Sequence, residues 1–228
     1  MVRMEPLFRV LIVGIVPQPT EVPPQPFDRE DLQKVFFEVS RDYPYSQFGL
    51  LSGDQGAQFL NPPHDRVLIQ PQLLQVQSPI GSGGTTDTTA ERSREKAVAV
   101  LSAAAERLAI RQFLSCGIKV QAEIPAPEGG ARNYVATNLF HQADRVDLLG
   151  QGFFGGGIKV WRFDPDTPGQ KIEILLVEPL LADDAFIYVD YDVQRNILLT
   201  DLNDLGGWID SALKFVREKT ITFLEEAS

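Results

Sequence analysis

The chain has 228 residues, of which 43% are hydrophobic and 23% are charged, and these fractions are typical of a globular protein with an ordinary core. Its 21 lysines and arginines against 31 acidic residues give a net charge of 21 − 31 = −10, which disfavours phosphate backbones over most of the surface. The single cysteine, Cys116, cannot form an intramolecular disulfide, so nothing indicates an oxidising compartment.

The first predicted element is a strand over residues 7–16, and its apolar part, Val10 to Val16, has to be compared with a targeting segment. Arg9 directly precedes this run, Glu5 breaks a positive flank, and no small-residue cleavage pattern follows. The run is also far too short to cross a membrane. We therefore expect a buried strand, no membrane association and a cytoplasmic protein.

A helix is predicted after the proline-rich run 17–26, which cannot pair inside a sheet. Asp28 is a favourable N-cap, and Glu30 and Asp31 suit the first helical turn. The helical pattern closes at Tyr43-Pro44, because a residue before proline disfavours helix.

Two strands are predicted next, over residues 47–60 and 66–77. The polar low-complexity segment Gly81 to Thr89 follows them, and we expect it to be a mobile loop. A second helix is predicted over residues 90–115, with Gly117 as its C-cap.

The order of elements then begins again in the second half of the chain. The pattern predicts a strand over 118–124, a helix over 133–149, strands over 153–163, 171–177 and 185–193, and a last helix over 202–226 capped by Asp201. This order predicts an α+β fold: a largely antiparallel sheet with helices packed on one side, in two halves of similar element order. We place the halves at residues 1–116 and 117–228, either as two domains or as one continuous domain.

Two glycine-rich strings match phosphate-binding loops in part. Gly150 to Gly155 fits G-x-G-x-x-G, but it follows a helix and leads into a strand, whereas a dinucleotide site needs the reverse order. Gly81 to Thr86 joins a strand to a helix, yet it lacks the Gly-Lys-Ser/Thr ending. We therefore expect both strings to be connections, and we expect no cofactor.

Carboxylates are the abundant functional groups of the second half. Asp190 and Asp192 lie two residues apart on a predicted strand, so they point to one face, and Glu173 lies on a neighbouring predicted strand. Such residues could hold a divalent metal or perform acid–base chemistry. The alternative, which we favour, is the polar and solvated face of a half-covered sheet.

Other candidate chemistry is sparse. His64, His141 and Cys116 are too few for a zinc site, and no catalytic residue can be assigned. The second predicted helix carries a group of basic residues: Arg92, Arg94, Lys96, Arg107 and Arg111. Because no aromatic residues are interleaved with them, we interpret them as a solvated helix face, and nucleic acid is not an expected partner.

Three short segments are similar to segments of a known group of proteins. They are Asp42-Tyr43-Pro44 at the end of the first helix, Tyr188 to Asp192 in the last strand, and Phe223 to Glu226 in the closing helix. With the overall layout, they resemble an uncharacterised, sporadically distributed bacterial protein family of similar length. The resemblance implies a bacterial protein and transfers no site residue.

We expect a non-catalytic binding or assembly protein that acts through a surface, because the core is well patterned while no catalytic constellation accompanies it. The alternatives are a carboxylate-based, metal-dependent enzyme acting on a phosphoester, and a nucleotide or nucleic-acid binder. The segment Val67 to Val76 is predicted to be an edge strand, since Pro71 cannot donate inside a sheet. Its apolar residues on both faces predict a homodimer or a protein partner, with Leu74 and Val76 at the interface.

Overall fold

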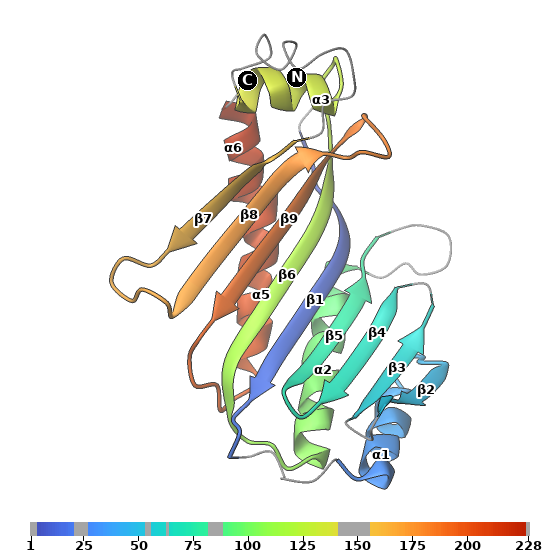
Figure 1. Ribbon diagram of the computed structural model, residues 1–228. Coiled ribbons are helices and arrows are strands. Elements are labelled where there is room, and N and C mark those ends of the chain that lie inside the picture. The colour runs from blue at the N-terminus through green and yellow to red at the C-terminus, as the bar shows by residue number, and fades with distance from the viewer. Residues whose placement is uncertain are drawn as a thin grey trace.

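The chain is organised by a single nine-stranded sheet in a computed structural model that describes residues 4–20, 27–52, 56–62, 64–81, 89–140 and 156–226 (Figure 1). The strands are β1 (Leu7–Pro17), β2 (Gln47–Leu50), β3 (Ala57–Asn61), β4 (Asp65–Gln70), β5 (Leu73–Pro79), β6 (Phe113–Pro125), β7 (Ile158–Phe163), β8 (Lys171–Pro179) and β9 (Phe186–Arg195). Their order in the sheet is β2-β3-β4-β5-β1-β6-β9-β8-β7, and every neighbouring pair is antiparallel.

The helices are α1 (Arg29–Val39), α2 (Ala90–Arg107), α3 (Ala131–Tyr134) with the π-helical turn η2 (Val135–Leu139), and α5 (Asp204–Lys214), which continues through the π-helical turn η4 (Phe215–Thr220) into α6 (Ile221–Glu226). In Figure 1 the long helices α2 and α5–α6 lie behind the sheet, and α1 lies beside α2. The predicted α+β class, antiparallel sheet and one-sided helices are therefore confirmed.

The two halves of the sequence build two halves of the sheet in the same way. In each half the first strand, β1 or β6, pairs with the last strand of the meander that follows it, β5 or β9. β1 and β6 pair with each other at the centre, where Gly14 lies opposite Gly117. Hydrogen bonding is therefore continuous across both halves, and the division after residue 116 lies inside β6.

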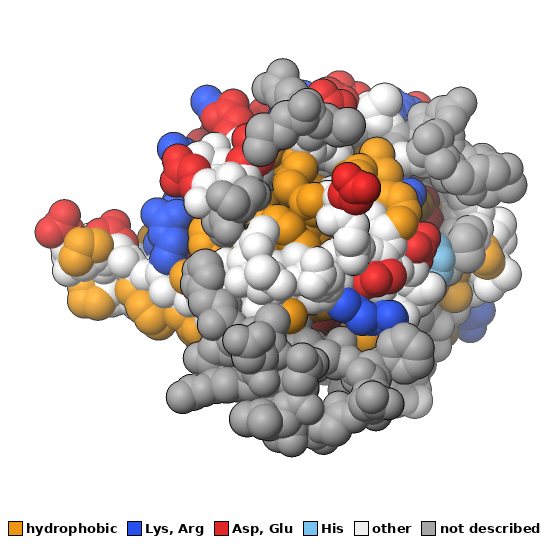
Figure 2. Space-filling view, turned by 90° about the horizontal axis from the view of Figure 1, so that it is seen from above, with side chains coloured by type: hydrophobic (Ala, Val, Ile, Leu, Met, Phe, Trp, Pro, Cys, Tyr) orange, Lys and Arg blue, Asp and Glu red, His pale blue; other side chains and the backbone are white. Residues whose placement is uncertain are grey.

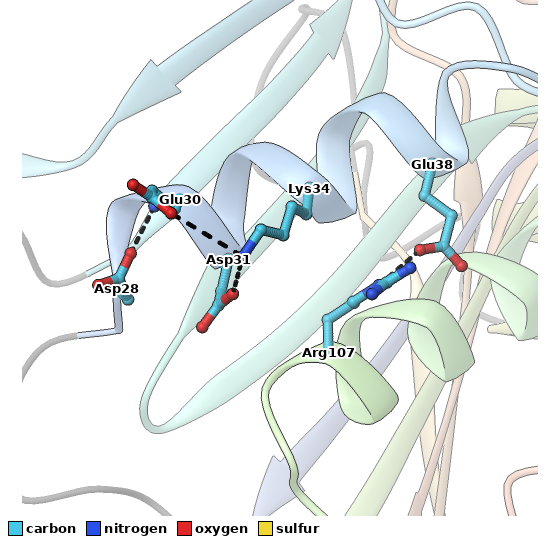
Figure 3. A network of polar contacts seen from close by, with 6 residues as sticks. All are labelled: Asp28, Glu30, Asp31, Lys34, Glu38 and Arg107. Carbon is cyan, nitrogen blue, oxygen red and sulfur yellow. Dashed lines mark hydrogen bonds and ion pairs between the residues drawn. The ribbon is translucent and has the colours of Figure 1, made fainter.

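Helix α1 begins as its sequence predicts. The Asp28 carboxylate accepts a hydrogen bond from the Glu30 backbone N–H at 2.6 Å, which satisfies one of the unpaired donors of the first turn. Lys34 forms an ion pair with Asp31 one turn earlier, at 2.9 Å (Figure 3). At the other end of α1, Glu38 accepts a hydrogen bond from Arg107 of α2 at 2.7 Å and so links the two helices.

The predicted strands 47–60 and 66–77 are each a pair of shorter strands. The second is the hairpin of β4 and β5, and Pro71 lies in its turn, where its missing N–H costs no ladder hydrogen bond. The prediction that Val67 to Val76 forms an edge strand is therefore wrong, since β5 lies between β4 and β1. The edges of the sheet are β2 and β7.

The second predicted helix ends eight residues earlier than expected. α2 stops at Arg107, Ala109 adopts a positive φ of 55°, and β6 already begins at Phe113. Gly117 is therefore a strand residue and not a helix cap. The reason is long-range, because residues 113–125 pair with β1 on one side and β9 on the other. Cys116 is buried, and burial raises the pKa of its thiol to about 12.

Several predictions concern residues outside the described part of the chain. They are the segment 82–88 of the predicted mobile loop, His141, the string Gly150 to Gly155 and the second half of the predicted helix 133–149. The last helix begins two residues later than predicted, at Asp204, and the prediction that Asp201 caps it is wrong, because its N-cap is Asn203. Among the described residues, no helix combines the length and the apolar character needed to cross a membrane.

Candidate functional site

The sheet has two faces of different character, because residues alternate along each strand. On β9, Ile187, Val189, Tyr191 and Val193 are buried against the helices, as the alternation predicts. The residues between them point to the opposite face, which we call the uncovered face. Figure 1 looks onto this face, and no described helix crosses it.

Asp190 and Asp192 lie on the uncovered face, where both contact Lys119 of β6. The Lys119 Nζ atom lies 3.4 Å from an Asp190 carboxylate oxygen and 3.7 Å from an Asp192 oxygen. Asp190 also accepts hydrogen bonds from Gln121 at 3.0 Å and from the Tyr188 hydroxyl at 3.2 Å. The two aspartates are therefore partly buried members of an ion-pair network, and not freely solvated residues.

Lys119 offsets part of the charge of the two aspartates. Burial raises the pKa of Asp192, and the neighbouring Asp190 adds to the rise, while the Lys119 charge opposes it. Glu173 does not join the pair, because it lies opposite Val193 and faces the helices. In the described ranges no group of three or more histidine, cysteine or acidic side chains is placed to hold a metal ion. No described third ligand therefore joins Asp190 and Asp192.

A hollow of about 460 Å³ lies beside the network, at the centre of the uncovered face. Its floor is the cross-strand pair Gly14 and Gly117, which have no side chains to fill the space. A Cβ atom added at Gly117 would meet nothing within 4 Å. Polar groups at its rim include Lys119, Asp192 and Gln75. The hollow therefore combines a bare backbone floor with a polar rim, and it can accept an inserted side chain.

Apolar residues gather on the same face at the β7 edge. We call them the apolar strip: Trp161, Phe163, Ile172, Ile174 and Leu176. The Trp161 and Phe163 side chains are 52% and 56% exposed, and their rings stack with centroids 6.3 Å apart. Figure 2 shows hydrophobic side chains along the hairpin of β7 and β8, which projects from the body at the left. Large exposed aromatic side chains next to an open edge are typical of a contact surface.

The interface residues predicted from the sequence lie elsewhere. Leu74 and Val76 are 0% exposed, since they point to the helix-covered face of β5 and belong to the core. The partly exposed neighbours on β5 are Leu73, Gln75 and Gln77. The sequence carried a signal for the apolar strip, because residues 158–163 place apolar side chains at both odd and even positions.

The basic residues of α2 do not form a common surface. Arg94 pairs with Asp210 at 2.8 Å, Arg107 pairs with Glu38, and Lys96 is buried in a contact with Asp65. Each of these three cations therefore has its own carboxylate on a different element. His64 is exposed in the turn before β4.

Comparison with protein-family models, with curated proteins and with solved structures gives no match for this chain. The resemblance to a bacterial family stays a prediction from three short segments. The functional argument therefore depends on the geometry of the uncovered face.

Proposed function

We propose that the chain is a non-catalytic assembly protein that forms a homodimer through the β7 edge and the apolar strip on its uncovered face. The observation that carries this proposal is the pair of half-exposed, stacked rings of Trp161 and Phe163 beside an unpaired sheet edge. Helices cover the equivalent apolar residues on the other face of the sheet. A second copy that pairs along β7 would bring its own strip against this one and bury part of both strips.

The β7 edge supports pairing between two copies. It offers backbone N–H and C=O groups that have no strand partner among the described residues. Two antiparallel copies of β7 would extend the sheet and place the two apolar strips side by side on one face. The same contact surface on both copies is what a two-fold dimer requires.

We expect sedimentation of the wild-type chain to give a mass near twice 25.3 kDa at micromolar concentrations. Replacing Trp161 and Phe163 together by serine should raise the dimer dissociation constant by about 30-fold or more, since buried aromatic anchors contribute about 2 kcal/mol or more. Phe37→Ser is the matched control, because Phe37 is 64% exposed on α1 and far from this edge. A monomeric wild-type chain, or a double variant that dimerises as well as the control, would contradict the homodimer.

Gly117→Val tests whether the hollow is used in the same contact. A Cβ atom added at Gly117 meets nothing within 4 Å, and valine replaces a glycine in a strand interior, so the free energy of unfolding should rise by about 0.5–1 kcal/mol. If a side chain of the second copy inserts into the hollow, the dimer dissociation constant should rise at the same time. Urea unfolding and sedimentation of one sample measure both effects. An unchanged dissociation constant would restrict the contact to the strip and the β7 edge.

A further inference from the structure

A second hollow, of about 230 Å³, lies on the helix-covered side of the molecule between β7–β9 and the α5–η4 helix. We call it the basic pocket. Its lining includes four cations: Arg162, Lys171, Arg195 and Lys219. The carboxylate in the described lining is Glu173, so the local charge is 4 − 1 = +3. Such a charge stands out in a chain whose net charge is −10.

Glu173 is fully engaged by groups other than Arg195 and Lys219. It accepts hydrogen bonds from the Tyr191 hydroxyl at 2.6 Å and from Lys171 at 2.8 Å, and the Arg162 guanidinium lies 3.7 Å away. Burial alone would raise the pKa of Glu173, but these hydrogen bonds and charges lower it below its ordinary value. Lys171 and Arg162 therefore neutralise the Glu173 carboxylate, and the charges of Arg195 and Lys219 remain.

Arg195 is held in a position that lacks an anion. It lies directly opposite Lys171 in the β8–β9 register, and like charges in that position repel each other. Its guanidinium is stacked over the Trp208 ring, 4.8 Å from the ring centre. Its Nε atom is buried and has no hydrogen-bond partner within the described ranges, and no described carboxylate pairs with Arg195 or Lys219. An unpaired buried donor is costly unless a ligand satisfies it.

We propose that the basic pocket binds a phosphate group, either inorganic phosphate or a phosphomonoester. A planar guanidinium offers a fork of donors that matches a phosphate, and Trp208 holds this fork in place. Arg195, Lys219 and Lys171 lie on different elements and can each approach a different oxygen of a doubly charged, tetrahedral phosphate. A carboxylate ligand would present only two oxygens to these three cations. The Ser211 hydroxyl in the lining adds a neutral donor. This site lies on the other side of the sheet from the proposed dimer surface and does not depend on it.

Calorimetric titration of the full chain with inorganic phosphate, and separately with phenyl phosphate, tests the proposal. We expect saturable binding with one phosphate per chain. Arg195→Met keeps the apolar stem over Trp208 but removes the charge and the donors, and it should weaken binding at least tenfold. Arg195→Lys keeps the charge without the fork and should give an intermediate loss. Lys219→Met, at an exposed helix position, supplies a second variant that preserves the fold if Arg195→Met does not.

Arg66→Met is the control, because it removes the same charge from an exposed position on the uncovered face. It should leave the phosphate dissociation constant unchanged. Tighter binding of phenyl phosphate than of inorganic phosphate would identify a monoester as the ligand, and the reverse order would identify the free anion. No saturable binding to the wild-type chain, an equal loss in Arg66→Met and Arg195→Met, or malonate binding as tightly as phosphate would overturn the proposal.

Discussion

Replacing Lys96 with methionine is expected to lower the free energy of unfolding by about 3–5 kcal/mol, because the substitution leaves a buried carboxylate without its cation. Lys96 of α2 and Asp65 of β4 form an ion pair whose side chains are 7% and 12% exposed. The Lys96 ammonium also lies over the Tyr45 ring, 4.7 Å from its centre. Methionine preserves the length and apolar stem of the lysine, so the loss reports the charge. Urea unfolding of the wild-type chain and of Lys96→Met measures the difference in the free energy of unfolding.

Two further variants distinguish the effect of the unpaired Asp65 carboxylate on stability from the effect of lost packing. The double replacement Lys96→Met with Asp65→Leu should recover most of the stability, since replacing a whole buried ion pair by apolar residues is often close to neutral. Arg107→Met is the control on the same helix, and we expect no measurable loss, because its ion pair with Glu38 is exposed to solvent. A double variant as unstable as Lys96→Met would show that the unpaired Asp65 carboxylate does not cause the loss of stability.

The stability deficit of Lys96→Met should also depend on pH. Burial raises the pKa of Asp65 above its ordinary value, and the Lys96 charge opposes this rise, so removing Lys96 raises it further. A group with a raised pKa in the folded state binds its proton more tightly there than in the unfolded chain. The deficit is therefore largest above the folded pKa and shrinks as the pH falls through it toward about 4, the unfolded value. A deficit that is constant from pH 7 to about pH 4 would exclude this origin.

Phe59→Ala should be the other severe substitution, with an expected loss of about 3–5 kcal/mol in the free energy of unfolding. Phe59 of β3 is 0% exposed, and its ring packs against Phe36 of α1 at 5.3 Å, Phe48 of β2 at 5.9 Å and Tyr45 at 6.1 Å. This aromatic cluster attaches α1 and the β2 edge to the rest of the sheet. Truncation would leave a cavity that the surrounding rings cannot fill without moving.

Phe37→Ala is the matched control for the aromatic cluster. Phe37 is next to Phe36 in α1 but is 64% exposed, and its ring forms a T-shaped pair with the Phe36 ring at 5.5 Å between centroids. We expect a loss below about 1 kcal/mol, the range of a single aromatic pair. Urea midpoints of both variants at one pH provide the comparison. Equal losses at positions 37 and 59 would mean that the described packing of α1 on β3 is not what stabilises this end of the sheet.

Elements whose signals are local could be predicted from the sequence. Asp28 caps α1 because its carboxylate needs only the N–H two residues later. The period of two along β9 separated Ile187 and Val189 from the aspartates. These features depend on neighbours within a few residues, so composition and spacing were enough to predict them.

The pairing of the strands and the choice of the covered face depend on contacts between distant parts of the chain. The end of α2 at Arg107 follows from the pairing of residues 113–125 with two distant strands, which overrides a helical pattern that would have continued. An alternating strand shows that two faces exist but not which one meets the helices, so Leu74 was assigned to a surface when it lies in the core. The basic pocket joins Arg162, Arg195 and Lys219 from separate elements, and the hollow joins Gly14 to Gly117 across about half the chain. Such sites depend on long-range register, which no local pattern in the sequence contains.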